Sequence, residues 1–221
     1  MSYFTKDYLQ FLSELTINND REWFNANKAR FKEKVEAPFK LFIKELIDQT
    51  SAVDPRINIT EKEAIFRIYK DVRFSKDKTP YKTHMTAAIG PGGRKSNKIG
   101  GIYLHLGADH FRIYTGFYMP TPKQVQLVRE AIASDMKGFK KIIEATQFKK
   151  LFGSIQGEEH KRVPKEFAEL IEEQPLLQKK SYYAFHEFKP ETILKKDLLE
   201  VCMVHFIAAQ PLGVFFDQAL E

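Results

Sequence analysis

The chain has 221 residues, 43% of them hydrophobic and 29% charged, and its 35 Lys and Arg residues outnumber its 29 Asp and Glu residues to give a net charge of +6. These values are ordinary for globular proteins, and the single cysteine, Cys202, excludes an internal disulfide framework. No apolar run approaches the length of a membrane span, and the first residues lack the apolar core of a signal peptide. We therefore expect a cytoplasmic protein that does not cross a membrane.

The helical spacing of apolar residues predicts two helices in the N-terminal part of the chain. The first begins after Thr5, a suitable N-cap, and ends before the turn-forming residues 18–20. The second is long and is kinked or broken at Pro38, because proline removes a backbone donor from the helix interior. The apolar residues of the two helices are Phe4, Tyr8, Phe11, Leu12 and Leu15, then Phe24, Phe31, Val35, Phe39, Phe42 and Leu46.

The start of the second helix combines one tryptophan with several side-chain donors. We expect Trp23 to be a core anchor that closes the N-terminal helices over the sheet, so that its truncation to alanine would cost about 3–5 kcal/mol. Arg21 and Lys28 lie near the N-terminus of this helix, where added donors can receive an anion. Both are additional candidates for an anion-binding site.

Alternation of apolar and polar residues predicts a mostly antiparallel sheet. The turn at 107–110 joins two of its strands as a hairpin. Between two others, Gly90–Ser96 departs from the phosphate-loop motif, because Lys95 occupies its second required glycine position, and we expect a basic loop there. The expected strands are Ala64–Tyr69, His84–Ile89, Ile102–Leu106, Phe111–Tyr118 and Ser181–Phe188, with a weaker signal at Ile57–Ile59.

Helices are also expected in the C-terminal half. Thr121 and Gln124 form a capping box with proline at the first helical position, and Val125, Val128, Ile132 and Met136 give that helix its buried stripe. Further helices are expected over Phe139–Phe152, from Pro164 to Pro175, and over about Lys195–Ala209, before Pro211. The order of helices, strands and helices predicts an α+β fold, with a single domain over residues 1–221 and a mostly antiparallel sheet packed with helices from both ends of the chain.

Positive charge is concentrated in one segment. Between Arg67 and Lys98 nine basic residues face two acidic ones, a net charge of +7 against +6 for the whole chain. Like charges at this density repel one another, so a compact fold must expose them, pair them or bind an anion. The guanidinium groups among them match phosphate and carboxylate oxygens. The segment therefore predicts an anion-binding site.

The alternation of residues 64–69 places Arg67 and Tyr69 on one face, and continued extension would add Asp71 and Arg73 to it. Asp71 would then lie between two guanidinium groups and could orient both, although a structural Arg–Asp–Arg network would give the same pattern. Residues 77–80 form a turn. The candidate ligand-binding residues are Arg67, Asp71, Arg73, Lys76, Lys78, Tyr81 and Lys82.

None of the six histidines lies in a metal-binding motif, so we expect no metal site and no cofactor. His205 falls in an apolar helix, where a core histidine is expected. His84 and His105 fall on expected strands near the basic segment and could act as a general acid or base. The nucleophile-elbow motif of many hydrolases is absent.

The chain resembles the domain of unknown function 2461 family of conserved hypothetical proteins over nearly its whole length. The most specific motif is R-I-Y-K-D-V-R-F-S-K-D-K-T-P-Y-K, Arg67–Lys82, in which Lys70 stands where the family usually has arginine. A second is N-N-D-R-E-W-F-N-A-N-K, Asn18–Lys28, and weaker ones are Gly116–Pro120 and Lys161–Phe167. The resemblance implies a compact single α+β domain and no established activity.

Two classes of function and one alternative remain. The first is a pocket for a small anionic ligand that bears phosphate or carboxylate, with enzymatic activity left open. The second is a nucleic-acid-binding module, favoured by aromatic residues among the basic ones and by the basic loop. The alternative is a structural charge network in a protein whose partner site lies elsewhere. The sequence indicates no oligomeric state.

Overall fold

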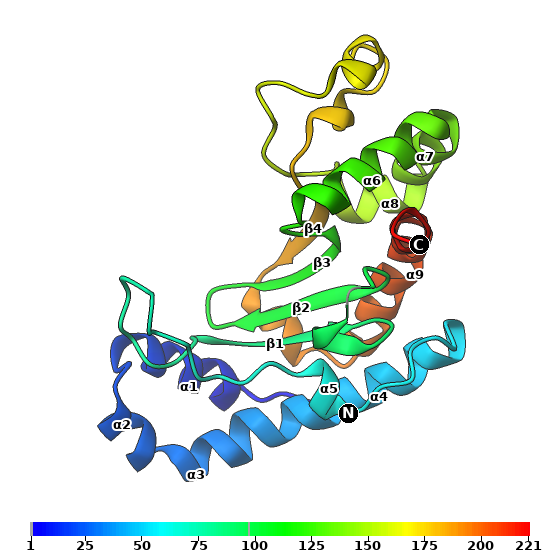
Figure 1. Cartoon of the computed structure of the whole chain (residues 1–221). Coiled ribbons are helices and arrows are strands. Elements are labelled where there is room, and N and C mark those ends of the chain that lie inside the picture. Colours follow the sequence, from blue (N-terminus) through cyan, green and yellow to red (C-terminus); the bar gives the residue numbers. More distant parts are fainter. Residues whose placement is uncertain (1, 97) are drawn as a thin grey trace. The chain divides into compact units, whose positions relative to one another are not determined.

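The computed structural model describes residues 2–96 and 98–221, and within them four strands form one antiparallel sheet in the order β1–β2–β3–β4 (Figure 1). They are β1 (His84–Ile89), β2 (Ile102–Gly107), β3 (Phe111–Phe117) and β4 (Tyr182–Phe188). Helices precede the sheet in the chain and also follow its third strand, so the predicted α+β class is confirmed. The four expected strands at these places are confirmed within one residue at each end.

Side chains alternate along β2 as the sequence pattern requires. Ile102, Leu104 and Leu106 are buried, whereas Tyr103 and His105 on the other face are half-buried. The turn between β2 and β3 is closed by the Gly107 amide, which donates to the carbonyl oxygen of His110 at 2.9 Å. This pairing confirms the expected hairpin.

The prediction of a strand over Ala64–Tyr69 is wrong for Ala64, and the residues after it do not form a regular strand. Thr60 and Glu63 form a capping box that opens a short helix, α5 (Glu61–Ala64), so Ala64 is helical. Residues 65–69 are extended but form only isolated bridges, Ile65 with Ala87 and Tyr69 with Tyr81. The weak strand signal at Ile57–Ile59 is also wrong, because these residues belong to an irregular connection.

Of the two helices expected near the N-terminus, the first is found as predicted and the second is divided. The first is α1 (Lys6–Ile17), with Thr5 at its N-cap as predicted. The long second helix is divided into α2 (Arg21–Ala26), α3 (Lys28–Arg30), the π-helical segment η1 (Phe31–Glu36) and α4 (Ala37–Val53). Pro38 lies in the first turn of α4, directly after η1. The expected irregularity at Pro38 is thus a change in helix type, which suits a residue without a backbone donor.

The chain divides into two compact units, and the prediction of a single domain over residues 1–221 stays a prediction. The first unit comprises the described residues up to Ser96, with Tyr103–Ile113 and Glu187–Val204. Its α1 and α3 are joined by Arg30, whose Nε donates to Asp7 Oδ1 at 3.0 Å and whose Nη1 donates to Glu14 Oε2 at 2.5 Å. Its buried aromatic residues include Tyr8, Phe11, Phe24, Phe39, Phe42 and Tyr81.

Trp23 does not have the expected central place in this core. Its side chain is half-buried, and its ring lies 5.4 Å from the ring of Phe11. Its neighbour Phe24 is 1% exposed and stacks on Tyr81, with ring centroids 4.0 Å apart and planes 16° apart. The helical register of α2, which Asp20 fixes by accepting from the Trp23 amide at 2.9 Å, turns Phe24 inward and leaves Trp23 at the edge.

The second unit contains α6 (Pro122–Ser134), α7 (Met136–Ile143) and α8 (Thr146–Phe152). The capping box of Thr121 and Gln124 at the start of α6 is confirmed, whereas Met136 belongs to α7 and not to the α6 stripe. The helix expected over Phe139–Phe152 is two helices, and Pro164 is followed by a 3₁₀ helix, η3 (Lys165–Leu170). The remaining short 3₁₀ helices are η2 (Gly93–Lys95), η4 (Pro175–Gln178) and η5 (Pro190–Leu194).

The last helix, α9 (Leu198–Ala219), continues through Pro211, so the expected end near Ala209 is wrong. Leu212 and Phe216 beyond the proline are both buried, and their burial outweighs the lost hydrogen bond. The Asp217 carboxylate accepts from the Ile99 amide at 2.6 Å. A Cβ on Gly213 would lie 2.6 Å from the Gly100 Cα, so a side chain is excluded there.

By length and composition α9 could cross a membrane, which corrects the expectation that no apolar run has that length. It is the one such helix among residues 2–96 and 98–221, and 44% of its most apolar window is buried within the protein. Core helices of soluble proteins have the same length and composition, so α9 is weak evidence for a membrane protein.

Three aromatic truncations test this account of the first unit. We expect Phe24→Ala to lower the free energy of unfolding by about 3–5 kcal/mol, because a fully buried ring is lost. Trp23→Ala should cost less, roughly 1–2 kcal/mol, and Phe74→Ala, which removes a side chain that is 95% exposed, should change stability by less than about 0.5 kcal/mol. Urea unfolding measures all three, and a Trp23 loss equal to that of Phe24 would contradict the structure.

Candidate functional site

The basic segment forms a loop with a fixed base. Tyr69 bridges to Tyr81, the Lys70 amide donates to the Pro80 carbonyl at 2.9 Å, and the Lys82 amide donates to the Ile68 carbonyl at 2.8 Å. The Asn19 side chain also fixes the base of the loop. Its Nδ2 donates to the Tyr81 carbonyl at 2.9 Å, and its Oδ1 accepts from the Tyr81 amide at 3.0 Å. The loop between these ends extends beyond β1 (Figure 1).

Both carboxylates of the loop are engaged by cations of the loop. Asp71 accepts from Arg73, with Nε–Oδ1 at 2.9 Å and Nη2–Oδ2 at 2.7 Å. Asp77 accepts from the Lys70 ammonium and from the Thr79 amide at 2.9 Å. The hydrogen bonds from Arg73 lower the pKa of Asp71 to about 2, and those from Lys70 and Thr79 hold the pKa of Asp77 well below its usual value.

The predicted Arg–Asp–Arg arrangement is therefore correct for one arginine only. Asp71 is hydrogen-bonded to Arg73, while Arg67 lowers the pKa of Asp71 only by its charge. A further cation of the loop, Lys78, donates to the Val72 carbonyl oxygen at 3.0 Å. These bonds brace the loop internally, which is the role foreseen in the structural alternative.

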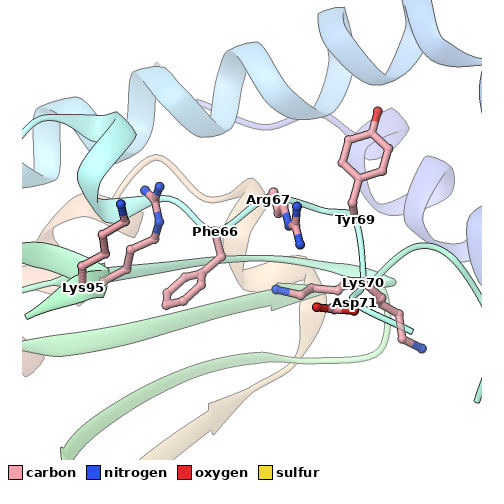
Figure 2. Close-up of a pocket in the computed structure, with 8 residues that line it drawn as sticks. Phe66, Arg67, Tyr69, Lys70, Asp71 and Lys95 are labelled. Carbon is pink, nitrogen blue, oxygen red and sulfur yellow. The ribbon is translucent and has the colours of Figure 1, made fainter. Parts of the chain in front are cut away.

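An open pocket of about 620 Å³ lies beside the base of the loop (Figure 2). Figure 2 shows Lys95 and Phe66 toward one end, Lys70 and Asp71 toward the other, and Arg67 between them. Arg94 and Lys95 come from η2, which follows β1. The complete lining is Phe66, Arg67, Tyr69, Lys70, Asp71, Lys82, Arg94 and Lys95.

The pocket brings together only part of the predicted site. Arg67, Asp71 and Lys82 line it, whereas Arg73, Lys76, Lys78 and Tyr81 do not. Arg21 and Lys28, exposed on α2 and α3, also lie outside its lining. Sequence reasoning missed Lys70, Arg94, Lys95, Phe66 and Tyr69 as lining residues, although the charge count up to Lys98 had included the three basic ones.

Tyr81 is a core residue and not a donor in the pocket. Its side chain is 4% exposed and lies between Phe24 and Tyr69, with ring centroids 4.0 and 5.4 Å away. Burial is the main reason why the pKa of Tyr81 is raised. Its place in the basic segment made Tyr81 a candidate ligand-binding residue, but the sequence could not show that Phe24 of α2 covers its ring.

Arg67 and Lys82 differ from Lys70 and Arg94, which also line the pocket. Lys70 is bound to Asp77 and Thr79, and the Arg94 guanidinium donates to the Lys62 carbonyl oxygen. Across residues 2–96 and 98–221, by contrast, neither Arg67 nor Lys82 has a carboxylate or carbonyl partner. Burial, and then the charge of Arg67, lower the pKa of Lys82.

Three histidines form a row in the first unit. The ring centroids of His84 and His105 are 3.8 Å apart, and those of His105 and His110 are 4.6 Å apart. Burial is the main cause that lowers the pKa of His84 to about 4 and that of His105 to about 3, and nearby cations, Lys82 among them for His84, lower both further. Both imidazoles are therefore neutral near pH 7. They do not line the pocket.

No group of His, Cys, Asp or Glu side chains in the described part of the chain has an arrangement that could hold a metal ion. The three histidines of the row are included in this finding, and their rings are tilted to one another by 30° and 35°.

The family model described as "Conserved hypothetical protein (DUF2461)" matches residues 7–215, nearly the whole chain. The chain belongs to this family. Comparisons with curated proteins and with solved structures gave no match. Membership confirms the resemblance drawn from Asn18–Lys28 and Arg67–Lys82, and the structure shows that these two segments contact each other. Asn19 and Phe24 of the first hold the backbone and the ring of Tyr81 in the second.

The histidine row makes stability depend on pH. The pKa values of His84 and His105 lie below the ordinary value of 6.5, so the unfolded chain binds more protons, and their contribution is complete above pH 6.5 and lost as the pH falls toward 4 and 3. Each such proton lowers the free energy of unfolding by about 1.4 kcal/mol per pH unit.

We expect urea unfolding to show this decline between about pH 7 and pH 5, and we expect His105→Gln to make it shallower. Lys123→Ala, which changes an exposed side chain of α6, should leave the slope as in the wild type. An identical slope in the His105 variant would show that the row does not titrate as described.

Proposed function

We propose that the pocket beside Arg67 binds a small anionic ligand that bears phosphate or carboxylate, in a protein of the cytoplasm. The observation that carries this proposal is the pair Arg67 and Lys82, two cations that line one pocket and have no carboxylate or carbonyl partner among residues 2–96 and 98–221. The two acids of the loop are hydrogen-bonded to Lys70 and Arg73, and neither is hydrogen-bonded to Arg67 or Lys82.

The electrostatics of the lining support an anion and disfavour a neutral or cationic ligand. Five basic side chains and one acidic side chain surround the pocket. Two close cations raise each other's free energy, as the effect of Arg67 on the pKa of Lys82 shows, and an anion between them would relieve that repulsion. The volume of about 620 Å³ lies within the range of roughly 300–1,000 Å³ that is typical of small-molecule sites.

The geometry also separates two roles within the basic segment. Arg73, Lys78 and the Lys70–Asp77 pair fix the loop, and Arg67 and Lys82 are left for a ligand. The structural network and the binding site are thus neighbouring parts of one segment, and the proposal assigns ligand binding only to the second.

Thermal denaturation with inorganic phosphate, pyrophosphate and a set of carboxylates tests the proposal. At a hundredfold excess over its dissociation constant a ligand adds about 2.7 kcal/mol of stability, which for a chain of this length raises Tm by about 5–10 °C. We expect such a rise at low salt, and we expect Arg67→Ala and Lys82→Ala to abolish it.

The controls separate the pocket from general basicity. Arg73→Ala and Lys123→Ala remove one positive charge each outside the lining, and the rise in Tm should persist in both. Loss of the shift in the Arg73 variant would mean that the whole loop, and not the pocket, binds the anion. No shift with any compound would refute the proposed function.

A second candidate function is binding of single-stranded nucleic acid. Its support is Phe74, which is 95% exposed at the loop and has the Arg73 guanidinium 5.8 Å from its ring centroid, together with Tyr69, which is 47% exposed. Exposed rings stack on bases, and neighbouring cations contact phosphates. Lys76 and Lys78 lie on the same loop, and Lys76 is exposed.

A salt titration of oligonucleotide binding distinguishes this candidate. Phe74→Ala should weaken binding by about 1–3 kcal/mol without changing the salt slope, because it removes stacking alone. Lys76→Ala should reduce the slope by about 0.7, because it removes one phosphate contact with a single strand. Fluorescence anisotropy measures both, and equal affinities for the wild type and the Phe74 variant would exclude a role for this ring.

A further inference from the structure

Among the lysines that line the pocket, Lys82 alone is both partly buried and without an acceptor in the described chain. Its ammonium lies 5.4 Å from the ring centroid of Phe66, and Arg67 is close enough to affect its protonation. Lys70 is held by Asp77 and by the Thr79 hydroxyl at 2.7 Å, and Lys95 is exposed on η2. Lys82 therefore differs from Lys70, which has acceptors, and from Lys95, which is exposed.

This environment makes the neutral amine of Lys82 easier to form than that of an exposed lysine. Partial burial disfavours a charged group, and the guanidinium of Arg67 adds repulsion, so both lower the pKa of Lys82. Among residues 2–96 and 98–221 no carboxylate forms an ion pair with its ammonium group. Lysines activated for reaction with carbonyl compounds show the same combination of desolvation and a neighbouring cation, because only the neutral amine is a nucleophile.

The pocket can also bind an anionic group of a molecule that reacts with Lys82. Arg67 lines the same cavity, has no acceptor within the described residues and presents a planar fork that suits phosphate or carboxylate. A ligand that carries an anionic group at Arg67 would place the rest of its atoms near Lys82. The Phe66 ring, whose centroid lies 5.4 Å from the Lys82 ammonium, lines the same cavity.

We propose that Lys82 forms an imine with an anionic aldehyde or ketone, a compound that carries both a carbonyl group and a phosphate or carboxylate. The inference rests on the proposed function and names the class of its ligand. The neutral Nζ attacks the carbonyl carbon, and the resulting carbinolamine loses its hydroxyl as water. Nitrogen loses both of its hydrogens overall, and any proton taken from solvent is returned to it. The carbon–nitrogen double bond that remains is reversible by the addition of water.

Pyridoxal 5′-phosphate is a suitable probe, because it combines an aldehyde with a phosphate and its imine absorbs visible light. The full-length protein is incubated with an equimolar amount of the probe, reduced with borohydride, digested and mapped by mass spectrometry. Borohydride transfers hydride to the imine carbon and leaves a stable secondary amine. We expect the adduct on Lys82 before any other lysine, and we expect inorganic phosphate to compete with its formation.

Two lysine-to-arginine variants complete the experiment. Lys82→Arg keeps the charge and removes the nucleophile, so the adduct should be lost while the rise in Tm with phosphate remains. Lys44→Arg makes the same change at an exposed position of α4 outside the pocket lining and should leave the Lys82 adduct unchanged. Peptide mapping of the wild type needs no variant, so the result stands even if Lys82→Arg proves unstable.

The outcomes separate this inference from the function on which it rests. Adducts spread over exposed lysines, or a rate that phosphate does not affect, would overturn the role of Lys82. If phosphate raises Tm but no Lys82 adduct forms with the probe, the pocket binds anions and the imine proposal fails. If neither phosphate nor the probe changes Tm, the proposed function fails as well.

Discussion

The position of Tyr81 is the constraint on which the basic segment depends. Its ring stacks on Phe24 in the core, and its backbone donor and acceptor are both satisfied by the side chain of Asn19. A paired amide in a partly buried place is worth little in net energy but is expensive to leave unpaired, so these bonds fix one register. That register determines which side chains of residues 66–70 lie opposite residues 80–82, and it brings Arg67 and Lys82 to one pocket.

Charge in this segment follows a simple division. Asp71 pairs with Arg73 and Asp77 pairs with Lys70, in both cases through hydrogen bonds as well as charge attraction. Both ion pairs are partly exposed, so solvent weakens them. These ion pairs therefore contribute little to the free energy of unfolding, and their main effect is to hold the conformation of the loop. The pocket lining contains the cations Arg67, Lys82 and Lys95, for which no hydrogen-bonded partner is found among the described residues.

Much of the fold was readable from local patterns, and the failures have identifiable causes. Strands that alternate and helices with strong caps, such as the one opened by Thr121, were predicted because the signal and the structure are both local. Residues 64–69 alternate as well, but the capping box of Thr60 and Glu63 takes Ala64 into a helix. Pro211 predicted a helix end, and burial of Leu212 and Phe216 overrode it.

The candidate site shows the same limit. Composition located the basic segment and named Arg67 and Lys82, because charge density needs no knowledge of the fold. It could not separate paired from unpaired cations, since the partners of Arg94 and Lys70 depend on the path of the loop. Tyr81 was misjudged because Phe24, which covers it, is remote in sequence.

The pocket and the histidine row interact electrostatically through Lys82 and His84. Lys82 lines the pocket and, after burial, is the next cause that lowers the pKa of His84. An anion bound at Lys82 would offset that charge and raise the pKa of His84 toward its ordinary value. By thermodynamic linkage, protonation of His84 would strengthen binding of the anion by the same factor. Because burial holds His84 neutral well below pH 7, this coupling acts only in acid, and near neutral pH the proposed ligand meets Arg67 and Lys82 beside a row of uncharged imidazoles.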